Sequence, residues 1–233
     1  MRLAIIPARA GSKRIKNKNI KKFFKKPIIY WSIKAAIESK LFDKVIVSTD
    51  SNRIANLAKR FGAETPFIRP KKLSNDFVNA NEVVKHAIQW FIKKNIFFKQ
   101  ICCIYPTAPF LTKTIIKRGF NLLIKKKKSF SFVVTSFPHP IERALEIKKN
   151  GNIIPISKNS EKKRSQYFKT MHHDVGQMYW GTSEAFLKNK NIFSKHSVAI
   201  TIPRYLAHDI NTNEEWKKAE LVFEVLKKNN FKL

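Results

Sequence analysis

The residues best suited to chemistry stand together near the start of the chain, in the segment Arg9-Ala10-Gly11-Ser12-Lys13-Arg14 with Lys18 and Asn19 just beyond it. Arginine grips phosphate oxygens through two parallel hydrogen bonds, and lysine adds a movable positive charge. Glycine lets the backbone turn tightly, so that N–H groups approach a phosphate. The segment lacks the G-x-x-x-x-G-K-[ST] spacing of a P-loop. It therefore predicts an anion-binding loop of another kind, and an ordinary basic loop is the alternative that the spacing leaves open.

The elements around this loop place it at the edge of a sheet. The apolar run 3–8 precedes it directly and is typical of a buried parallel strand. Strand-like and helical patterns then follow one another at 27–37, 44–48, 54–61, 82–92, 100–105, 113–124 and 130–135. This alternation predicts an α/β fold, a mainly parallel twisted sheet flanked by helices. Ligands of such sheets bind beyond the carboxyl ends of the strands, where the loop lies.

The alternation stops after Ser136. Asn150-Gly151 is the strongest short signal for a hairpin, and a polar stretch follows it from Ser157 to Asp174. Further strands are predicted at 177–180 and 199–202, and an amphipathic helix at 213–226. We expect a single domain over residues 1–233, with an irregular, hairpin-containing insertion at 137–175.

Several short motifs carry a family resemblance over nearly the whole chain. They are Pro7-Ala8-Arg9-x-Gly11-Ser12-Lys13, Val47-Ser48-Thr49-Asp50, Phe67-Ile68-Arg69-Pro70, Tyr105-Pro106-Thr107-Ala108-Pro109-Phe110 and His208-Asp209-Ile210-Asn211-Thr212. In this order they resemble the CMP-sialic-acid synthetase family, which are cytidylyltransferases. The stretch His173-Asp174-x-Gly176-Gln177-x-Tyr179-Trp180 is most similar to the branch that acts on pseudaminic acid. The resemblance implies a nucleotide-diphospho-sugar transferase-like fold and a reaction of CTP with a free nonulosonic acid that releases pyrophosphate, for surface glycan biosynthesis.

The resemblance also implies roles for individual residues. The nucleotide would contact Ala8, Arg9, Gly11, Ser12, Lys13, Lys18, Asn19 and Arg69, and the acidic nine-carbon sugar would contact Thr107, Arg164, Gln166 and Tyr179. Catalysis would depend on Arg9, Lys13, Lys18 and Asp209.

Magnesium is the cofactor that the resemblance implies, held by Asp209 and Asn211. Alternate residues of an extended segment point the same way, so both side chains can face one ion. The second position carries an acid in the family and an amide here, which should weaken Mg²⁺ binding. The resemblance further implies a homodimer, with the insertion at 137–175 as the partner surface and a segment of the sugar site.

The charge of the chain suggests a polyanionic partner, because 47 Lys and Arg against 16 Asp and Glu give a net charge of +31. The lysines are scattered, however, in a chain rich in Ile, Asn and Phe, whose codons are AT-rich. The longest basic run, 125–128, follows a predicted helix and suits its C-terminal end. Genome composition can produce such an excess, so the charge is open to a compositional or a functional explanation, and we expect no nucleic-acid partner.

Cys102 and Cys103 are adjacent on a predicted strand and point to opposite faces, so we expect two reduced core residues rather than a disulfide. No apolar run approaches the roughly 18 residues that span a membrane. The run 3–8 is too short for a signal peptide, so we expect a cytoplasmic enzyme without a membrane partner.

Other functions stay open at this point. A CMP-N-acetylneuraminate or CMP-legionaminate synthetase would differ by one or two pocket contacts. A glycosyltransferase that uses a sugar nucleotide would favour D-x-D at the end of a central strand, where this chain has Tyr105-Pro106-Thr107. A nucleic-acid-binding module would need cations interleaved with aromatic residues on one exposed surface.

Overall fold

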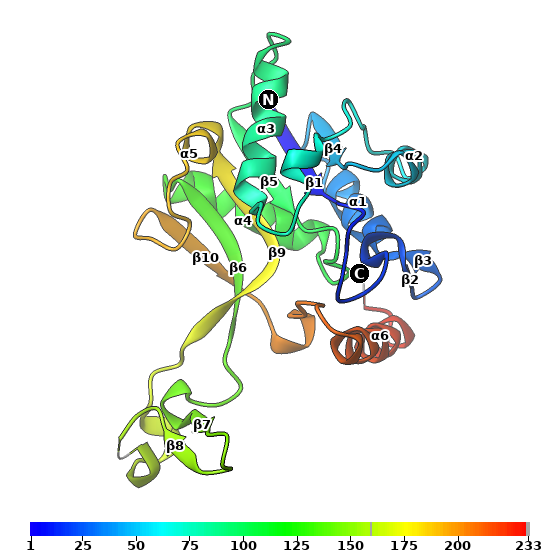
Figure 1. Cartoon of the computed structure of the whole chain (residues 1–233). Helices are drawn as coiled ribbons and strands as arrows, with labels where there is room; N and C mark the ends of the chain where they lie inside the picture. Colours follow the sequence, from blue (N-terminus) through cyan, green and yellow to red (C-terminus); the bar gives the residue numbers. More distant parts are fainter. Residues whose placement is uncertain (159, 232–233) are drawn as a thin grey trace.

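A six-stranded sheet forms the centre of the computed structural model, which describes residues 1–158 and 160–231 (Figure 1). Its strands, in spatial order, are β10 (Ser197–Thr201), β6 (Phe130–Ser136), β9 (His172–Thr182), β5 (Gln100–Ile104), β1 (Arg2–Pro7) and β4 (Lys44–Ser48). β9 runs antiparallel to β5 and β6, whereas the other neighbours are parallel. The predicted mainly parallel sheet is confirmed.

Helices cover both faces of the sheet, because the strands are apolar on both sides. One core contains Ala4, Ile6 and Cys102 and is covered by α1 (Ile28–Glu38), α2 (Asn52–Arg60), α4 (Lys113–Lys125) and α6 (Asn213–Lys228). The other contains Leu3, Ile5 and Cys103 and is covered by α3 (Ala80–Ile92) and α5 (Ser183–Leu187). The two cysteines are buried, free and on opposite faces, as predicted.

Between β6 and β9 the chain leaves this body and forms a projecting segment, residues 137–171, which we call the arm (Figure 1). The hairpin predicted at Asn150-Gly151 lies here and joins β7 (Leu145–Ile147) to β8 (Ile153–Pro155). A second small hairpin, β2 (Lys22–Phe23) with β3 (Lys26–Pro27), precedes α1 in the body.

The structure differs from the sequence prediction at β9. This strand begins at His172, inside the stretch to Asp174 that was expected to be irregular, because His172–Asp174 pair with the end of β6 through backbone hydrogen bonds. Their side chains are largely solvated there, so the segment has no apolar periodicity to reveal it. The five-residue helix α5 was also not predicted, and its length gives too few turns for a periodic signal.

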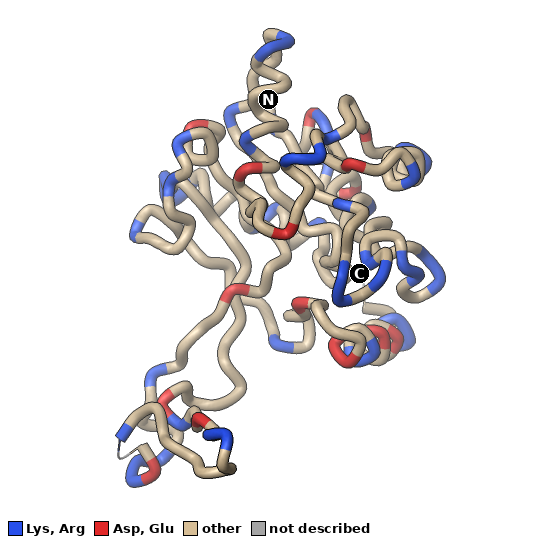
Figure 2. The backbone as a smooth tube through the Cα atoms, in the orientation of Figure 1, with Lys and Arg blue, Asp and Glu red and all other residues tan. Residues whose placement is uncertain are grey.

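Lysine and arginine lie along the whole chain, on the body and on the arm (Figure 2). This distribution agrees with the scatter of lysine in the sequence. Within residues 1–158 and 160–231, no helix is both long enough and apolar enough to cross a membrane.

Candidate active site

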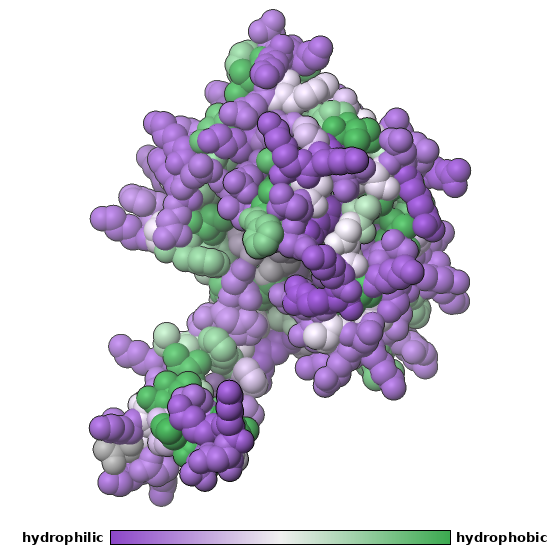
Figure 3. Space-filling view, viewed as in Figure 1, coloured by the Kyte–Doolittle hydropathy of each residue, from purple (hydrophilic) through white to green (hydrophobic). Residues whose placement is uncertain are grey.

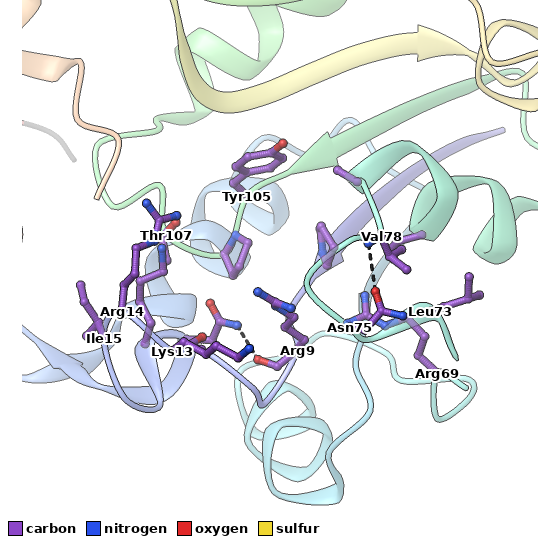
Figure 4. A pocket seen from close by; sticks show the side chains of 17 residues that line it. Arg9, Lys13, Arg14, Ile15, Arg69, Leu73, Asn75, Val78, Tyr105 and Thr107 are labelled. Carbon is purple, nitrogen blue, oxygen red and sulfur yellow. Dashed lines mark hydrogen bonds between the residues drawn. The ribbon is translucent and has the colours of Figure 1, made fainter. Parts of the chain in front are cut away.

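A pocket of about 250 Å³ opens where β1, β4 and β5 end at the same edge of the sheet. Arg9, Lys13 and Arg14 line the pocket from the loop after β1. Tyr105 and Thr107 line it from the segment after β5 (Figure 4). Arg69, Leu73, Asn75 and Val78 complete the wall from the segment that precedes α3 (Figure 4). The pocket therefore joins three segments that are far apart in the sequence.

Hydrogen bonds from backbone N–H groups join the beginning of the loop after β1 to the end of β4 and the residues after it. The Ala8 and Ala10 backbone N–H groups donate to the Ser48 carbonyl and to Asp50 Oδ1, each over 2.9 Å. Inside the loop, the buried Asn19 amide donates to the Arg9 carbonyl over 2.8 Å. Ala8 and Asn19 thus stabilise the conformation of the loop through these hydrogen bonds.

Gly11 lies at the centre of a tight three-residue turn, because the Ser12 N–H donates to the Ala10 carbonyl over 2.9 Å. Gly11 has no left-handed backbone conformation, and a Cβ atom at this position would meet nothing within 4 Å. Asn17 carries the left-handed conformation of the loop, with φ 54°. An ordinary L-residue could adopt the backbone of Gly11 without strain.

Two of the loop's cations share one carboxylate. Arg9 Nη2 and Lys13 Nζ each lie 2.6 Å from an oxygen of Asp76. Hydrogen bonds from Lys13 and then Arg9 lower the pKa of Asp76, so this side chain carries its negative charge at neutral pH. Asp76 comes from the segment between Arg69 and α3.

Lys18 links the loop to the segment before α6. Its Nζ donates to the Ile210 carbonyl over 2.7 Å and to Asn211 Oδ1 over 3.4 Å. Burial lowers the pKa of Lys18, and the nearby Asp209 opposes this shift. Arg14 Nη2 also donates to Asn211 Oδ1, over 3.0 Å. The oxygen that was predicted to face a metal ion therefore faces two cations.

Arg69 is buried on the other side of the pocket. Its Nε donates to Ser74 Oγ over 3.0 Å, and its backbone N–H donates to the Thr49 carbonyl over 2.7 Å. Burial lowers the pKa of the guanidinium, while Asp50 acts in the opposite direction. These contacts hold a polar, planar group against the pocket.

A pair of carboxylates stands beside this pocket. Gly176, with φ 65°, has a backbone that favours glycine, and a Cβ atom there would lie 3.6 to 3.8 Å from the Asp209 carboxyl group. The Gly176 N–H also donates to Asp174 Oδ1 over 3.2 Å. Although Asp209 as a whole residue is exposed, desolvation of its carboxyl group is the main cause that raises its pKa, and Asp174 adds to it.

These oxygens fit a divalent cation better than Asn211 does. Asp174 and Asp209 bring two carboxyl groups to the same residue, Gly176, and hard cations prefer carboxylate oxygens. Within the part of the chain that the structure describes, no group of three or more His, Cys, Asp and Glu side chains could hold a metal. A bound ion would therefore need phosphate and water as its other ligands.

A second pocket, of about 640 Å³, lies on the other side of Tyr105. Tyr105 and Ala80 line both pockets, and Tyr179, Asp174 and Asn81 line the second. The Tyr179 hydroxyl donates to Asp174, and the rings of Tyr105 and Tyr179 lie 5.5 Å apart. Burial raises the pKa of both phenols, which therefore stay protonated and act as donors.

The structure brings most of the predicted site residues together. Arg9, Ser12, Lys13, Lys18, Asn19 and Arg69 line the first pocket, and Tyr179 lines the second. Thr107 was predicted to contact the sugar but lies in the first pocket with the cationic loop. Arg164 and Gln166 lie exposed on the arm and line neither pocket.

The sequence prediction missed Asp50, Asp76, Asp174 and Tyr105. Three of the four stand within motifs quoted for the resemblance: Asp50 ends Val47-Ser48-Thr49-Asp50, Asp174 is part of the stretch before Trp180, and Tyr105 begins its motif. Asp76 has no local signal, since its contacts with Arg9 and Lys13 arise only when the chain folds.

Known proteins resemble the chain over almost its whole length. The family model described as cytidylyltransferase matches residues 3–228. The pseudaminic acid cytidylyltransferase of Campylobacter jejuni is 40% identical over 223 residues, covering 96% of each chain. A CMP-N,N'-diacetyllegionaminic acid synthase of Legionella pneumophila is 28% identical over 226 residues, again covering 96% of each chain.

Solved structures share the fold. CMP:2-keto-3-deoxy-manno-octonic acid synthetase complexed with CTP has a TM-score of 0.69 and covers 96% of this chain and 98% of its own. A 4-diphosphocytidyl-2C-methyl-D-erythritol synthase from Anaerococcus prevotii has a TM-score of 0.62. Each is 12% identical to this chain, so these similarities bear on the fold alone.

Proposed function

The chain belongs to the cytidylyltransferase family, and from this premise we propose that it transfers the cytidylyl group of CTP to pseudaminic acid, with release of pyrophosphate. Relatives that are 39 and 40% identical over 96% of the chain carry that name. The observation that carries the proposal is the pair of adjacent pockets, one lined by the cationic loop and one lined by Tyr179, Asn81 and Asp174, with Tyr105 in the wall of both.

We assign CTP to the cationic pocket. Arg9, Lys13 and Lys18 neutralise the triphosphate, and backbone N–H groups of their loop reach its oxygens. We assign the cytidine to the opposite wall, which the buried Arg69 lines. Because CTP is a cytoplasmic metabolite, we expect the enzyme to act in that compartment.

We assign the acidic sugar to the second pocket. Its walls supply the phenols of Tyr105 and Tyr179 and, in Asn81 Oδ1, a buried acceptor without a hydrogen-bond partner among the described residues. That oxygen suits an amide N–H of a nonulosonic acid. The anomeric hydroxyl attacks the α-phosphorus, an O–P bond forms, the bond to the β-phosphate breaks, and the hydroxyl proton is released. Positioning and neutralisation of charge are what such a transfer requires.

Cytidylyltransferases of this kind use a divalent metal, and we propose Mg²⁺ held by Asp209 and Asp174. Both carboxylates lie against Gly176, whereas the oxygen of Asn211 is occupied by Arg14 and Lys18. When bound, the ion would stabilise the negative charge on the departing pyrophosphate. Asn211 then has a supporting role, as its amide is hydrogen-bonded to Asp209 and lowers the pKa of that carboxyl group.

We further propose that the chain forms a homodimer through the arm. Large apolar side chains are exposed on it at Leu145, Ile147, Ile153, Ile154, Ile156, Tyr167 and Met171. Apolar surface is correspondingly prominent on the arm in Figure 3. A two-stranded hairpin such as β7–β8 is marginally stable alone in water, so this surface needs a partner.

A second copy would also complete the sugar site. The described lining of the second pocket offers one cation, Lys190, which already pairs with Glu184 over 3.8 Å. The sugar carboxylate calls for another cation, and Arg164 stands on the arm with Gln166, away from the pockets of its own chain. In a dimer, the arm of the partner copy would bring its Arg164 and Gln166 to the second pocket.

Mixing two inactive variants is therefore expected to restore activity. Arg164→Ala and Asp209→Ala should each be nearly inactive, because one lacks an arm contact and the other a metal ligand. Random reassociation should rebuild about a quarter of the sites, since one site of each mixed dimer combines an intact body with an intact arm. The measurement is pyrophosphate release after unfolding and refolding the mixture.

The matched control mixes Asp209→Ala with Lys13→Ala, whose changes both lie in the body. No site of that mixed dimer is intact, so activity should stay low. Equal recovery in both mixtures, or recovery in neither, would contradict the shared site.

The acceptor is tested with a panel of purified sugars. With CTP and Mg²⁺, pseudaminic acid is expected to give the highest kcat/KM, ahead of legionaminic and N-acetylneuraminic acids. UTP should be a poor substitute for CTP. Turnover of a neutral hexose phosphate with UTP, together with none of CTP, would overturn the proposal.

A further inference from the structure

Asp76 holds the two cations that the proposed reaction assigns to phosphate. Its two carboxylate oxygens each take one of them, Oδ1 from Arg9 and Oδ2 from Lys13, both over 2.6 Å. A carboxylate and a phosphate offer the same kind of acceptor oxygens, so they compete for the same donors. Asp76 lies outside the metal pair and has no part in the reaction described so far.

The segment that carries Asp76 is anchored at both ends and exposed at its tip. At one end Arg69 Nε donates to Ser74 Oγ over 3.0 Å. At the other, Asn79 caps α3 through a reciprocal pair of contacts with Glu82. Between them Asp76 is 36% exposed and Phe77 is 95% exposed, without a packed environment to fix them. Asn75 Oδ1 accepts from the Phe77 and Val78 N–H groups, so the backbone of the tip is held and the exposed Asp76 side chain is the part that can turn away from the two cations.

We propose that Asp76 is an internal competitor of phosphate that determines how tightly the site holds pyrophosphate. A phosphate ligand binds Arg9 and Lys13 only by displacing Asp76, and the carboxylate returns when the ligand departs. CTP and pyrophosphate meet the same penalty, so Asp76 weakens both. CTP retains its base contacts, whereas pyrophosphate loses much of its hold and is released quickly. This inference rests on the proposed function.

If Asp76 oriented the two cations instead of competing for them, its removal would have the opposite effect on phosphate binding. A carboxylate that merely orients Arg9 and Lys13 would prepare them for phosphate, and its removal would weaken binding. A competitor, once removed, would leave tighter binding. The sign of the change in affinity therefore separates the two roles.

The experiment measures binding of inorganic pyrophosphate by calorimetry to the wild type and to Asp76→Asn. The variant keeps the shape of the side chain and removes its charge. We expect the dissociation constant of pyrophosphate to fall about fivefold, the scale of partly exposed ion pairs. The inhibition constant of pyrophosphate against CTP should fall by the same factor. High salt should reduce the difference, because these charges are screened.

Glu64→Gln is the matched control. This variant also removes one negative charge and breaks an exposed ion pair, that of Glu64 with Lys44 at 2.9 Å. Lys44 lies at the beginning of β4, at the edge of the sheet opposite to the pocket. The pyrophosphate affinity of this variant should equal that of the wild type. Unchanged or weaker binding in Asp76→Asn, or equal tightening in both variants, would overturn the role of Asp76 and leave the proposed function intact. A wild type that binds no pyrophosphate would overturn the phosphate site itself.

Discussion

Replacing Asp209 with alanine is expected to lower kcat/KM by about 10³-fold even at saturating Mg²⁺, which corresponds to roughly 4 kcal/mol of transition-state stabilisation. The family resemblance assigns Asp209 to the metal, and its carboxyl group lies against Gly176. Asn211 cannot replace it, because its oxygen faces Arg14 and Lys18. The measurement is steady-state pyrophosphate release over a Mg²⁺ titration.

The same titration tests whether Asp174 or Asn211 is the second metal ligand. Asp174→Asn should raise the Mg²⁺ concentration required for half-maximal rate, because it removes the other charge. Asn211→Asp should change that concentration little, since the new carboxylate would pair with Arg14 and Lys18. An Asp209→Ala enzyme that keeps most of its activity would make Asp209 a turn residue and the metal assignment wrong.

Lys13→Ala is expected to lower kcat/KM for CTP by about 10²-fold, the scale of one lost electrostatic contact to a developing charge. Lys13 lines the pocket that we assign to CTP, and its Nζ pairs with the Asp76 carboxylate over 2.6 Å. The measurement is initial-rate kinetics with CTP varied at saturating sugar.

Lys126→Ala is the control for this change. Lys126 is exposed at the end of α4 and lies in the longest basic run, so the variant loses the same charge at a remote place. Its kcat/KM should remain at the wild-type value. Similar losses in the two variants would show that overall charge, rather than the loop, governs turnover.

Most of the fold could be predicted because buried strands and amphipathic helices leave periodic apolar patterns. Strands β1, β4, β5 and β6 are apolar on both faces and were visible as continuous runs. The beginning of β9 was not, since its side chains are largely solvated and its pairing with β6 is made by the backbone. Apolar patterns in the sequence therefore predict which strands are buried better than they predict which strands pair through the backbone.

The site was predictable where a motif is local and not where it depends on folding. The cationic loop is one continuous segment, so its residues were found together. Asp76 reaches Arg9 across more than sixty positions of sequence, and Asn211 meets Arg14 across 197, and neither contact has a sequence pattern. Thr107, which the resemblance assigned to the sugar, lines the first pocket with the cationic loop, and its sequence motif does not show which of two adjacent pockets it faces.

Phosphorus NMR of one reaction mixture tests the central claim most directly. The protein is incubated with CTP, pseudaminic acid and Mg²⁺, and the spectrum is followed with time. The account predicts that the three CTP resonances give way, in equal amounts, to pyrophosphate and a single phosphodiester resonance from the CMP-linked sugar. Loss of CTP to CMP or CDP without that phosphodiester, or no loss of CTP at all, would contradict it.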